Sequence, residues 1–279
     1  MLSKKQLVNK YIGYHEKLKN VNKINLKKNR NTMRIMTYNI HMWYDCFDKT
    51  NVKNICDIIF SSKADIIGLQ EIMFNKRTIQ IKKFIEIAKE NGYEYYRFCD
   101  VDGTNCLLSK YPVIESKVYS LEKDSVENQN RYAIIGKIKI NKKILNIIVT
   151  HLDVFDETGE TRKKQAHQII DKLNINENYI LLGDFNSLKQ DDYEEKQWIN
   201  IVKDDNKRGV DTICDTIPIF EKNNFVDCFS KKSCEHYNNT VWSNRRVDYI
   251  MVKQNNIKID KCFVLHATES DHCPVVMDI

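Results

Sequence analysis

Short apolar runs alternate with amphipathic stretches along most of this chain. The runs at 66–69, 147–149 and 179–182 are apolar at every position, or nearly so, as in strands buried on both faces. Residues 52–60 instead place their apolar side chains on one face, as a helix does. This pattern predicts strands at 34–38, 64–69, 93–99, 106–109, 113–121, 131–140, 143–150, 179–182, 247–252, 261–266 and 274–279. It predicts helices at 52–60, 79–89 and 162–173, and a partly helical stretch at 190–206.

Many strands with helices between them predict an α/β domain, in which sheets pack together under outer helices. No internal repeat or long linker interrupts residues 31–279, so we expect one domain there. Residues 1–30 are predicted to be a helical N-terminal extension, because their apolar positions recur every three or four residues. Those positions are Leu7, Tyr11, Tyr14, Leu18 and Val21.

Charge is distributed unevenly along the chain. The formal net charge is +6, but residues 1–30 carry nine Lys or Arg and one Glu, so +8 lies in the extension and −2 in the rest. A basic extension can contact nucleic acid or an anionic membrane. Lysine is abundant throughout the sequence, however, and a coding bias is the competing explanation.

The cysteines and the chain's hydropathy suggest a compartment. Nine cysteines without a repeated spacing argue against a disulfide framework, and we expect them to be ordinary core residues. The first residues lack the apolar core of a signal peptide, and nothing resembles a run of about 18 apolar residues that would span a membrane. We therefore expect an intracellular protein, not a secreted one, and a monomer.

Polar and ionisable side chains stand at the ends of several predicted strands. They are Asn39, Glu71, His151, Asp184, Asn186, Asp248, Asp271 and His272. Strand ends at one edge of a sheet are rigid points from which such groups can converge on a cleft. Carboxylate and amide oxygens suit a hard cation such as Mg²⁺, and imidazoles can donate to a phosphate. Each residue alone has an ordinary structural explanation, but the set together fits phosphoryl transfer.

Six segments that contain these residues resemble the endonuclease/exonuclease/phosphatase superfamily, in family order. They are Thr37-Tyr38-Asn39-Ile40-His41, Gly68-Leu69-Gln70-Glu71, Thr150-His151-Leu152, Gly183-Asp184-Phe185-Asn186, Arg246-Val247-Asp248-Tyr249-Ile250 and Ser270-Asp271-His272-Cys273-Pro274. The resemblance covers about residues 34–279. It implies a deoxyribonuclease I-like four-layer α/β sandwich, in which two mixed β-sheets pack face to face with helices outside. It also implies an Mg²⁺-dependent hydrolase of phosphate esters, in which Mn²⁺ can substitute.

The resemblance further implies a role for each residue. Glu71 would be the principal metal ligand, with Asn39 beside it and Asp271 near the metal or its waters. Asp184 would orient and deprotonate the attacking water, and Asn186 would hold that group or a phosphate oxygen.

Both histidines would act on the phosphate. His272 would donate to a non-bridging oxygen while Asp248 keeps it protonated, and His151 would contact the phosphate or help the leaving group. Arg131 and His41 are candidate substrate-binding residues. A surface position for Arg131 is equally open.

Nucleic acid is the predicted substrate, for a nuclease or a DNA-end-processing enzyme. The alternatives are a phosphatase or a sphingomyelinase-type phospholipase C acting on lipid head groups, and a catalytically inactive binding module. His41 and His151 depart from the pattern of AP endonucleases, which argues against that subgroup. We expect the loops 100–105, 122–130 and 203–244 to determine selectivity.

Overall fold

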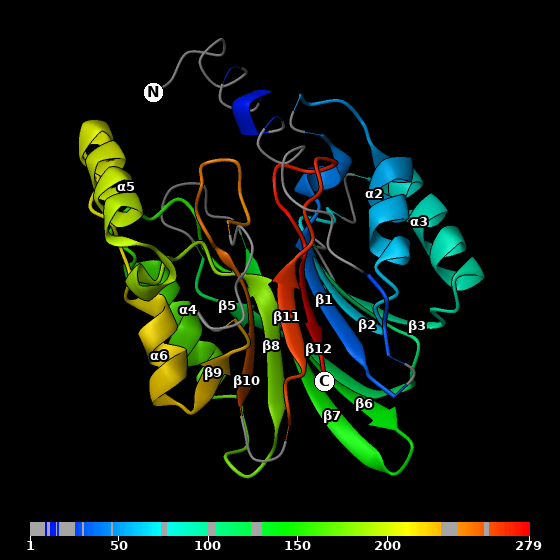
Figure 1. Cartoon of the computed structure of the whole chain (residues 1–279). Helices are drawn as coiled ribbons and strands as arrows, with labels where there is room; N and C mark the ends of the chain where they lie inside the picture. The colour runs from blue at the N-terminus through cyan, green and yellow to red at the C-terminus, as the bar shows by residue number, and fades with distance from the viewer. Residues whose placement is uncertain are drawn as a thin grey trace.

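The computed structural model describes residues 9, 12–14, 16, 26–29, 31–45, 47–73, 77–99, 104–123, 130–229, 239–253 and 257–279. Within them, strands form two six-stranded sheets that occupy the centre of the molecule (Figure 1). Helices lie on the two outer sides of this pair of sheets.

The first sheet has the strand order β11-β12-β1-β2-β4-β3. These strands are β1 (Arg34–Asn39), β2 (Ile66–Gln70), β3 (Tyr95–Phe98), β4 (Asn105–Ser109), β11 (Lys261–Val264) and β12 (Val275–Asp278). Strand β1 is parallel to β2, with Asn39 opposite Gln70, and the other neighbours are antiparallel. The ends of β1 and β2 therefore meet at one edge of the sheet.

The second sheet has the order β5-β6-β7-β8-β10-β9. These strands are β5 (Val113–Leu121), β6 (Arg131–Ile140), β7 (Lys143–His151), β8 (Tyr179–Asp184), β9 (Phe225–Asp227) and β10 (Asp248–Lys253). Strand β7 is parallel to β8 and places His151 opposite Asp184. Strand β10 is antiparallel to β8, so its first residue, Asp248, also lies opposite Asp184.

Side chains on the central strands alternate between two apolar environments. In β1, Ile35 packs between the sheets and Met36 packs against the helices α2 (Val52–Ser61) and α3 (Thr78–Glu90). In β8, Leu182 packs between the sheets and Leu181 packs toward α4 (Glu160–Ile170) and α6 (Thr216–Lys222). Because both faces are buried, these strands appear in the sequence as continuous apolar runs. The predicted four-layer α/β sandwich with two mixed sheets is confirmed.

Most predicted elements are present, with ends within three residues of those expected. The stretch 190–206 divides into a 3-10 turn (Gln190–Asp192) and helix α5 (Glu195–Arg208), and a second 3-10 turn covers His41–Trp43. Helix α6 and strand β9 were not predicted. They are short, with seven and three residues, so neither contains enough sequence to show a period.

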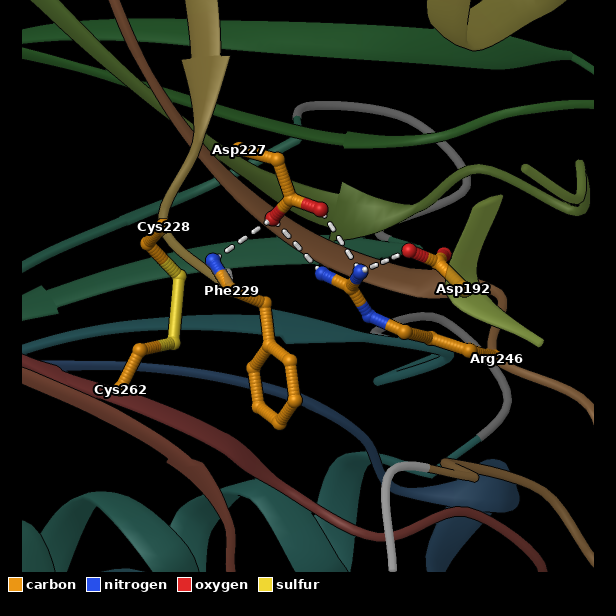
Figure 2. The surroundings of a disulfide bond; sticks show 6 residues. All are labelled: Asp192, Asp227, Cys228, Phe229, Arg246 and Cys262. Carbon is orange, nitrogen blue, oxygen red and sulfur yellow. Dashed lines mark hydrogen bonds and ion pairs between the residues drawn. A yellow bond between two sulfur atoms is a disulfide. The ribbon is translucent and has the colours of Figure 1, made fainter. Parts of the chain in front are cut away.

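One cysteine pair departs from the expectation of unpaired core cysteines. Cys228, just after β9, forms a disulfide with Cys262 in β11, and their Cα atoms are 6.0 Å apart (Figure 2). Strands β9 and β11 are edge strands of different sheets, so this bond joins the two sheets at their margin. The two residues are 34 positions apart, and connectivity over such a distance cannot be deduced from sequence spacing.

Part of the N-terminal extension contacts the body of the protein. Residue 9, residues 12–14 and residue 16 are helical, and Tyr14 is only 3% exposed. The Tyr14 hydroxyl lies 2.8 Å from the Cys273 sulfur. Leu7, Tyr11, Leu18 and Val21 of the predicted stripe lie outside the described residues. The division at residue 30 thus stays a prediction.

Candidate active site

Residues from both sheets meet at one edge of the sandwich. Asn39 ends β1, Glu71 follows β2, His151 ends β7, and Asp184 ends β8 beside Asp248 of β10. The loop before β12 adds Asp271 and His272. The structure therefore brings the sequence-predicted residues together, and the parallel pairs β1–β2 and β7–β8 explain how.

Asp184 lies at the centre of this group and is 1% exposed. Its Oδ2 accepts a hydrogen bond from Asn39 Nδ2 at 3.0 Å, and its Oδ1 accepts one from the backbone N–H of Asn186 at 2.9 Å. The same Oδ2 lies 3.6 Å from His151 Nε2 and 3.7 Å from His272 Nε2. Burial, reinforced by the charge of Asp248, raises the pKa of Asp184 to about 7. A carboxylate with this pKa can accept a proton near neutral pH.

His272 and Asp248 form a buried ion pair. His272 Nδ1 donates to Asp248 Oδ2 at 2.8 Å, and Asp248 is fully buried. Burial alone would lower the pKa of His272, but the carboxylates of Asp248, Asp271 and Asp184 outweigh it and raise the pKa well above its usual value. His272 is therefore an imidazolium at neutral pH, and its Nε2 faces Asp184.

A second pair of carboxylates lies on the side of the first sheet. Glu71 Oε1 accepts a hydrogen bond from Asn39 Nδ2 at 3.0 Å. Burial raises the pKa of Glu71, and the negative charge of Asp271 raises it further. The two negative charges repel each other unless a cation lies between them, and carboxylate oxygens are hard ligands that suit Mg²⁺. Glu71 also has a positive φ of 59°, a backbone conformation that is uncommon for residues other than glycine.

His41 lies on the same side, but its backbone is in closer contact than its ring. The N–H of His41 donates to Asn39 Oδ1 at 3.0 Å, whereas its ring Nδ1 is 3.8 Å from Asp271 Oδ1. His41, Met42 and Trp43 all have positive φ angles. This turn thus fixes the amide of Asn39, with its Nδ2 directed at Glu71 and Asp184.

The second imidazole, that of His151, is neutral, whereas that of His272 is protonated. Burial, followed by the charges of Arg131 and His272, lowers the pKa of His151 well below its usual value. Its Nε2 is 3.1 Å from Asn186 Nδ2, so the neutral ring accepts a hydrogen bond there. Its Nδ1 has no hydrogen-bond partner in the part of the chain that the structure describes. Arg131 is 4% exposed, which excludes the surface position left open above.

One further group of three residues can hold a metal ion. Asp184, Asp248 and His272 place their ligand atoms within 4.8 Å of one another. Asp248 and His272 already bond each other, however, and a protonated imidazole is not a ligand. The carboxylates of Glu71 and Asp271 fit a hard cation better, because both offer oxygen ligands, whereas Asn39 turns its Nδ2 toward Glu71 and its Oδ1 toward the His41 N–H.

Similarity to known proteins identifies the family. The profile described as endonuclease/exonuclease/phosphatase family matches residues 36–272. The chain belongs to this family. The members of this family are phosphoesterases, that is, enzymes that act on phosphate esters. A comparison with curated proteins gave no match.

Several solved structures of the family share this fold. An endonuclease/exonuclease/phosphatase from Beutenbergia cavernae superimposes with a TM-score of 0.67 at 17% identity, covering 89% of this chain and 71% of that one. Truncated TDP2 from Caenorhabditis elegans gives 0.61 at 17% identity, covering 89% and 97%. Sphingomyelinase C from Streptomyces griseocarneus gives 0.60 at 13% identity, covering 88% and 99%. At these identities the likeness establishes the fold alone.

A buried arginine supports this edge of the sandwich and was not assigned a role from the sequence. Arg246 is 1% exposed, and its Nη1 and Nη2 donate to the two oxygens of Asp227 at 2.6 and 2.7 Å (Figure 2). Nη1 also lies 3.1 Å from Asp192 Oδ1. Arg246 precedes Asp248 by two residues, so this network fixes the start of β10. The only sequence signal for a role of Arg246 was its position in a family motif. Its partner Asp227 could not be found from the sequence, because it belongs to the unpredicted strand β9.

No helix among the described residues is long and apolar enough to cross a membrane.

Proposed function

We propose that this chain hydrolyses phosphate esters by Mg²⁺-dependent attack of water, with nucleic acid as the substrate. The observation that carries the proposal is the position of Asp184. Its free lone pairs lie between the protonated His272 and the neutral His151, beside the Asn39–Glu71 contact. A proton acceptor, a cationic donor and an oxygen-rich cation site thus meet at one edge of the sandwich, as phosphoryl transfer requires.

Glu71 and Asp271 would hold the metal ion through their carboxylate oxygens, and Asn39 beside them would position Glu71 through the hydrogen bond from its Nδ2. The raised pKa of Glu71 beside a second carboxylate supports this choice, because a cation there removes the repulsion between the two. When bound, Mg²⁺ neutralises charge that develops on the phosphate oxygens, and Mn²⁺ shares its preference for oxygen ligands.

The remaining residues would carry out the proton transfers. Asp184 would orient the attacking water and take its proton, and Asn186 would hold that water or a phosphate oxygen. His272, kept protonated by Asp248, would donate from Nε2 to a non-bridging oxygen. His151 would contact the phosphate or the leaving group, and Arg131 and His41 would border the substrate.

The substrate proposal rests mainly on the N-terminal extension. Its +8 charge suits a polyanion, whereas the rest of the chain is slightly acidic. The lipid-head-group alternative and the inactive binding module are tested in the same experiment.

The test is a panel of substrates incubated with the purified protein and Mg²⁺. It comprises abasic duplex, 5′-tyrosyl DNA, plasmid, poly(A) RNA and sphingomyelin, each with and without EDTA. We expect cleavage of at least one nucleic acid, and a loss of more than about 100-fold in EDTA or in Glu71→Gln, since a lost metal costs several kcal/mol of transition-state stabilisation. Glu90→Gln, at an exposed position, is the control and keeps full activity.

Three outcomes would overturn parts of the proposal. Full cleavage in EDTA would reject the metal. Cleavage of sphingomyelin alone would reject nucleic acid. No cleavage of any substrate by a folded protein would favour the binding module.

A further inference from the structure

A cavity of about 360 Å³ opens beside the candidate active site. His272 and Asn186 are among the residues that line it. Other lining residues come from the end of α5, from the segment that follows α5, and from the bridge between Val241 and Arg245. All of these except Arg245 belong to the 203–244 region in which selectivity was expected. A ligand in this cavity would lie next to a phosphate held at His272.

Two arginines in this cavity are arranged by one buried carboxylate. Asp205 is 2% exposed, and its Oδ1 accepts hydrogen bonds from both Arg208 and Arg245. Its Oδ2 accepts one from the Thr212 hydroxyl at 2.8 Å. Two guanidinium groups therefore share a single negative charge, and each keeps donors that Asp205 does not use. The three groups together carry one net positive charge.

A third arginine, Arg162, also lines the cavity. Arg162 is 5% exposed, and its Nη1 donates to the backbone oxygen of Asp153 at 3.1 Å. Its buried Nε has no hydrogen-bond partner within the described ranges. A buried guanidinium with an unused donor beside a cavity is a feature that an anionic ligand satisfies.

The acidic residues that line the cavity, apart from Asp205, are either already hydrogen-bonded or exposed. Both oxygens of Asp156 already accept hydrogen bonds, Oδ1 from Thr158 at 2.6 and 2.9 Å and Oδ2 from the Thr161 backbone at 2.7 Å. Glu157 and Asp211 are exposed, so they lie at the rim rather than in the interior. Arg208 is exposed at the same rim, whereas Arg162 and the Arg245 side chain, which is 19% exposed, supply donors deeper in the cavity.

We propose that this cavity binds a second phosphate group of the substrate, next to the phosphate that is hydrolysed. The proposal rests on the proposed function, because it places the first phosphate at His272. A guanidinium group can donate two parallel hydrogen bonds to two oxygens of one phosphate. Arg208 and Arg245, which Asp205 orients, keep donors for such contacts. The second phosphate belongs either to the neighbouring nucleotide of a strand or to a small molecule with two phosphates.

Binding is tested first without catalysis. Calorimetry in EDTA compares inorganic pyrophosphate and inorganic phosphate on the wild type and on Arg208→Gln. This change leaves Asp205 paired with Arg245 and Thr212, and the Arg208 side chain is 59% exposed, so the fold should be retained. We expect pyrophosphate to bind more tightly than phosphate, and Arg208→Gln to weaken pyrophosphate by about 10-fold, the value of one charge-assisted hydrogen bond.

Controls separate this site from general charge effects. Lys53→Gln removes an exposed cation from α2 and should leave binding unchanged, whereas Arg208→Lys should retain part of it. Equal binding of pyrophosphate by the wild type and Arg208→Gln would overturn the proposal.

The second arm uses turnover and identifies the source of the phosphate. A dinucleotide with a terminal phosphate, the same dinucleotide without it, and a cyclitol bisphosphate are compared with bis(4-nitrophenyl) phosphate. We expect Arg208→Gln to raise KM by about 10-fold for substrates with two phosphates and to leave bis(4-nitrophenyl) phosphate unaffected. Equal effects on all of them would overturn the proposal. If no ester is cleaved while pyrophosphate binding still depends on Arg208, the proposed function fails and the anion site stands.

Discussion

Replacing Gly183 with alanine should damage both the fold and the catalytic edge. Gly183 immediately precedes Asp184 in β8 and lies opposite Thr150 of β7. A Cβ added there would be 2.4 Å from the backbone oxygen of Thr150, and 3.1 and 3.2 Å from side-chain atoms of Thr150 and Phe185. The nearest atom is backbone, one residue before the end of the paired strand β7, so it cannot rotate away.

The size of the effect follows from this distance. A carbon and a carbonyl oxygen normally approach no closer than about 3.3 Å, so β7 and β8 would have to shift by roughly 0.9 Å. Overpacking in a core costs about 1–3 kcal/mol, and a clash against backbone belongs at the upper end of that range. The next pair along the two strands is His151 and Asp184. A displacement of about 1 Å there can reduce turnover by about 100-fold.

Gly136→Ala is the matched control. Its added Cβ would also lie 2.4 Å from the nearest atom, but that atom is Cδ2 of Leu107, the end of a flexible side chain. We expect a loss of about 1 kcal/mol or less, since Leu107 can change rotamer. Urea unfolding at pH 7 and turnover of whichever substrate the wild type cleaves are the assays. Equal losses in the two variants, or a Gly183→Ala protein as stable as the wild type, would refute this reasoning.

Two further predictions concern the ion pair and the extension. Asp248→Asn should lower the pKa of His272, because it removes the negative charge that stabilises the imidazolium, and the alkaline limb of the pH–rate profile should move to lower pH. The Asp248–His272 pair stabilises the folded protein fully below pH of about 6.5, and this stabilisation is lost as pH rises through the folded-state pKa of His272. An NMR titration of His272 that is the same in Asp248→Asn and the wild type would contradict the coupling. Removing residues 1–30 should lower the midpoint of thermal unfolding, because Tyr14 is buried against Cys273. It should also flatten the salt dependence of nucleic-acid binding, and a truncated protein unchanged in both would reject the two proposed roles.

Local pattern predicted the central strands well, and the reason is their double burial. Strands β2 and β8 are apolar on both faces and end in polar residues, so their length and their functional ends are visible within a few positions. Glu71 and Asp184 were located in this way. The order of the motifs, which matches that of the family, then predicted that residues distant in sequence belong to one site. Composition and periodicity alone would not have predicted this.

Features that depend on distant partners were not visible in the sequence. Strand β9 has three residues, and the importance of Asp227 comes from Arg246, 19 positions away. Cys228 and Cys262 meet only because the edges of two sheets are brought together. The two arginines that share Asp205 come from α5 and from the segment before β10, and no local pattern links them.

Asn39 connects the chemistry to the packing of the sandwich. Its Nδ2 donates both to Glu71, on the first sheet, and to Asp184, on the second, at 3.0 Å in each case. The distance between the proposed metal ligand and the proposed base is therefore set by how the two sheets pack, and a change that moves one sheet alters both. The cavity with Arg208 and Arg245 lies outside this contact, on a helix and a connecting segment. Arg208 and Arg245 can change without disturbing Asn39, which is the physical condition under which one fold serves different phosphate esters.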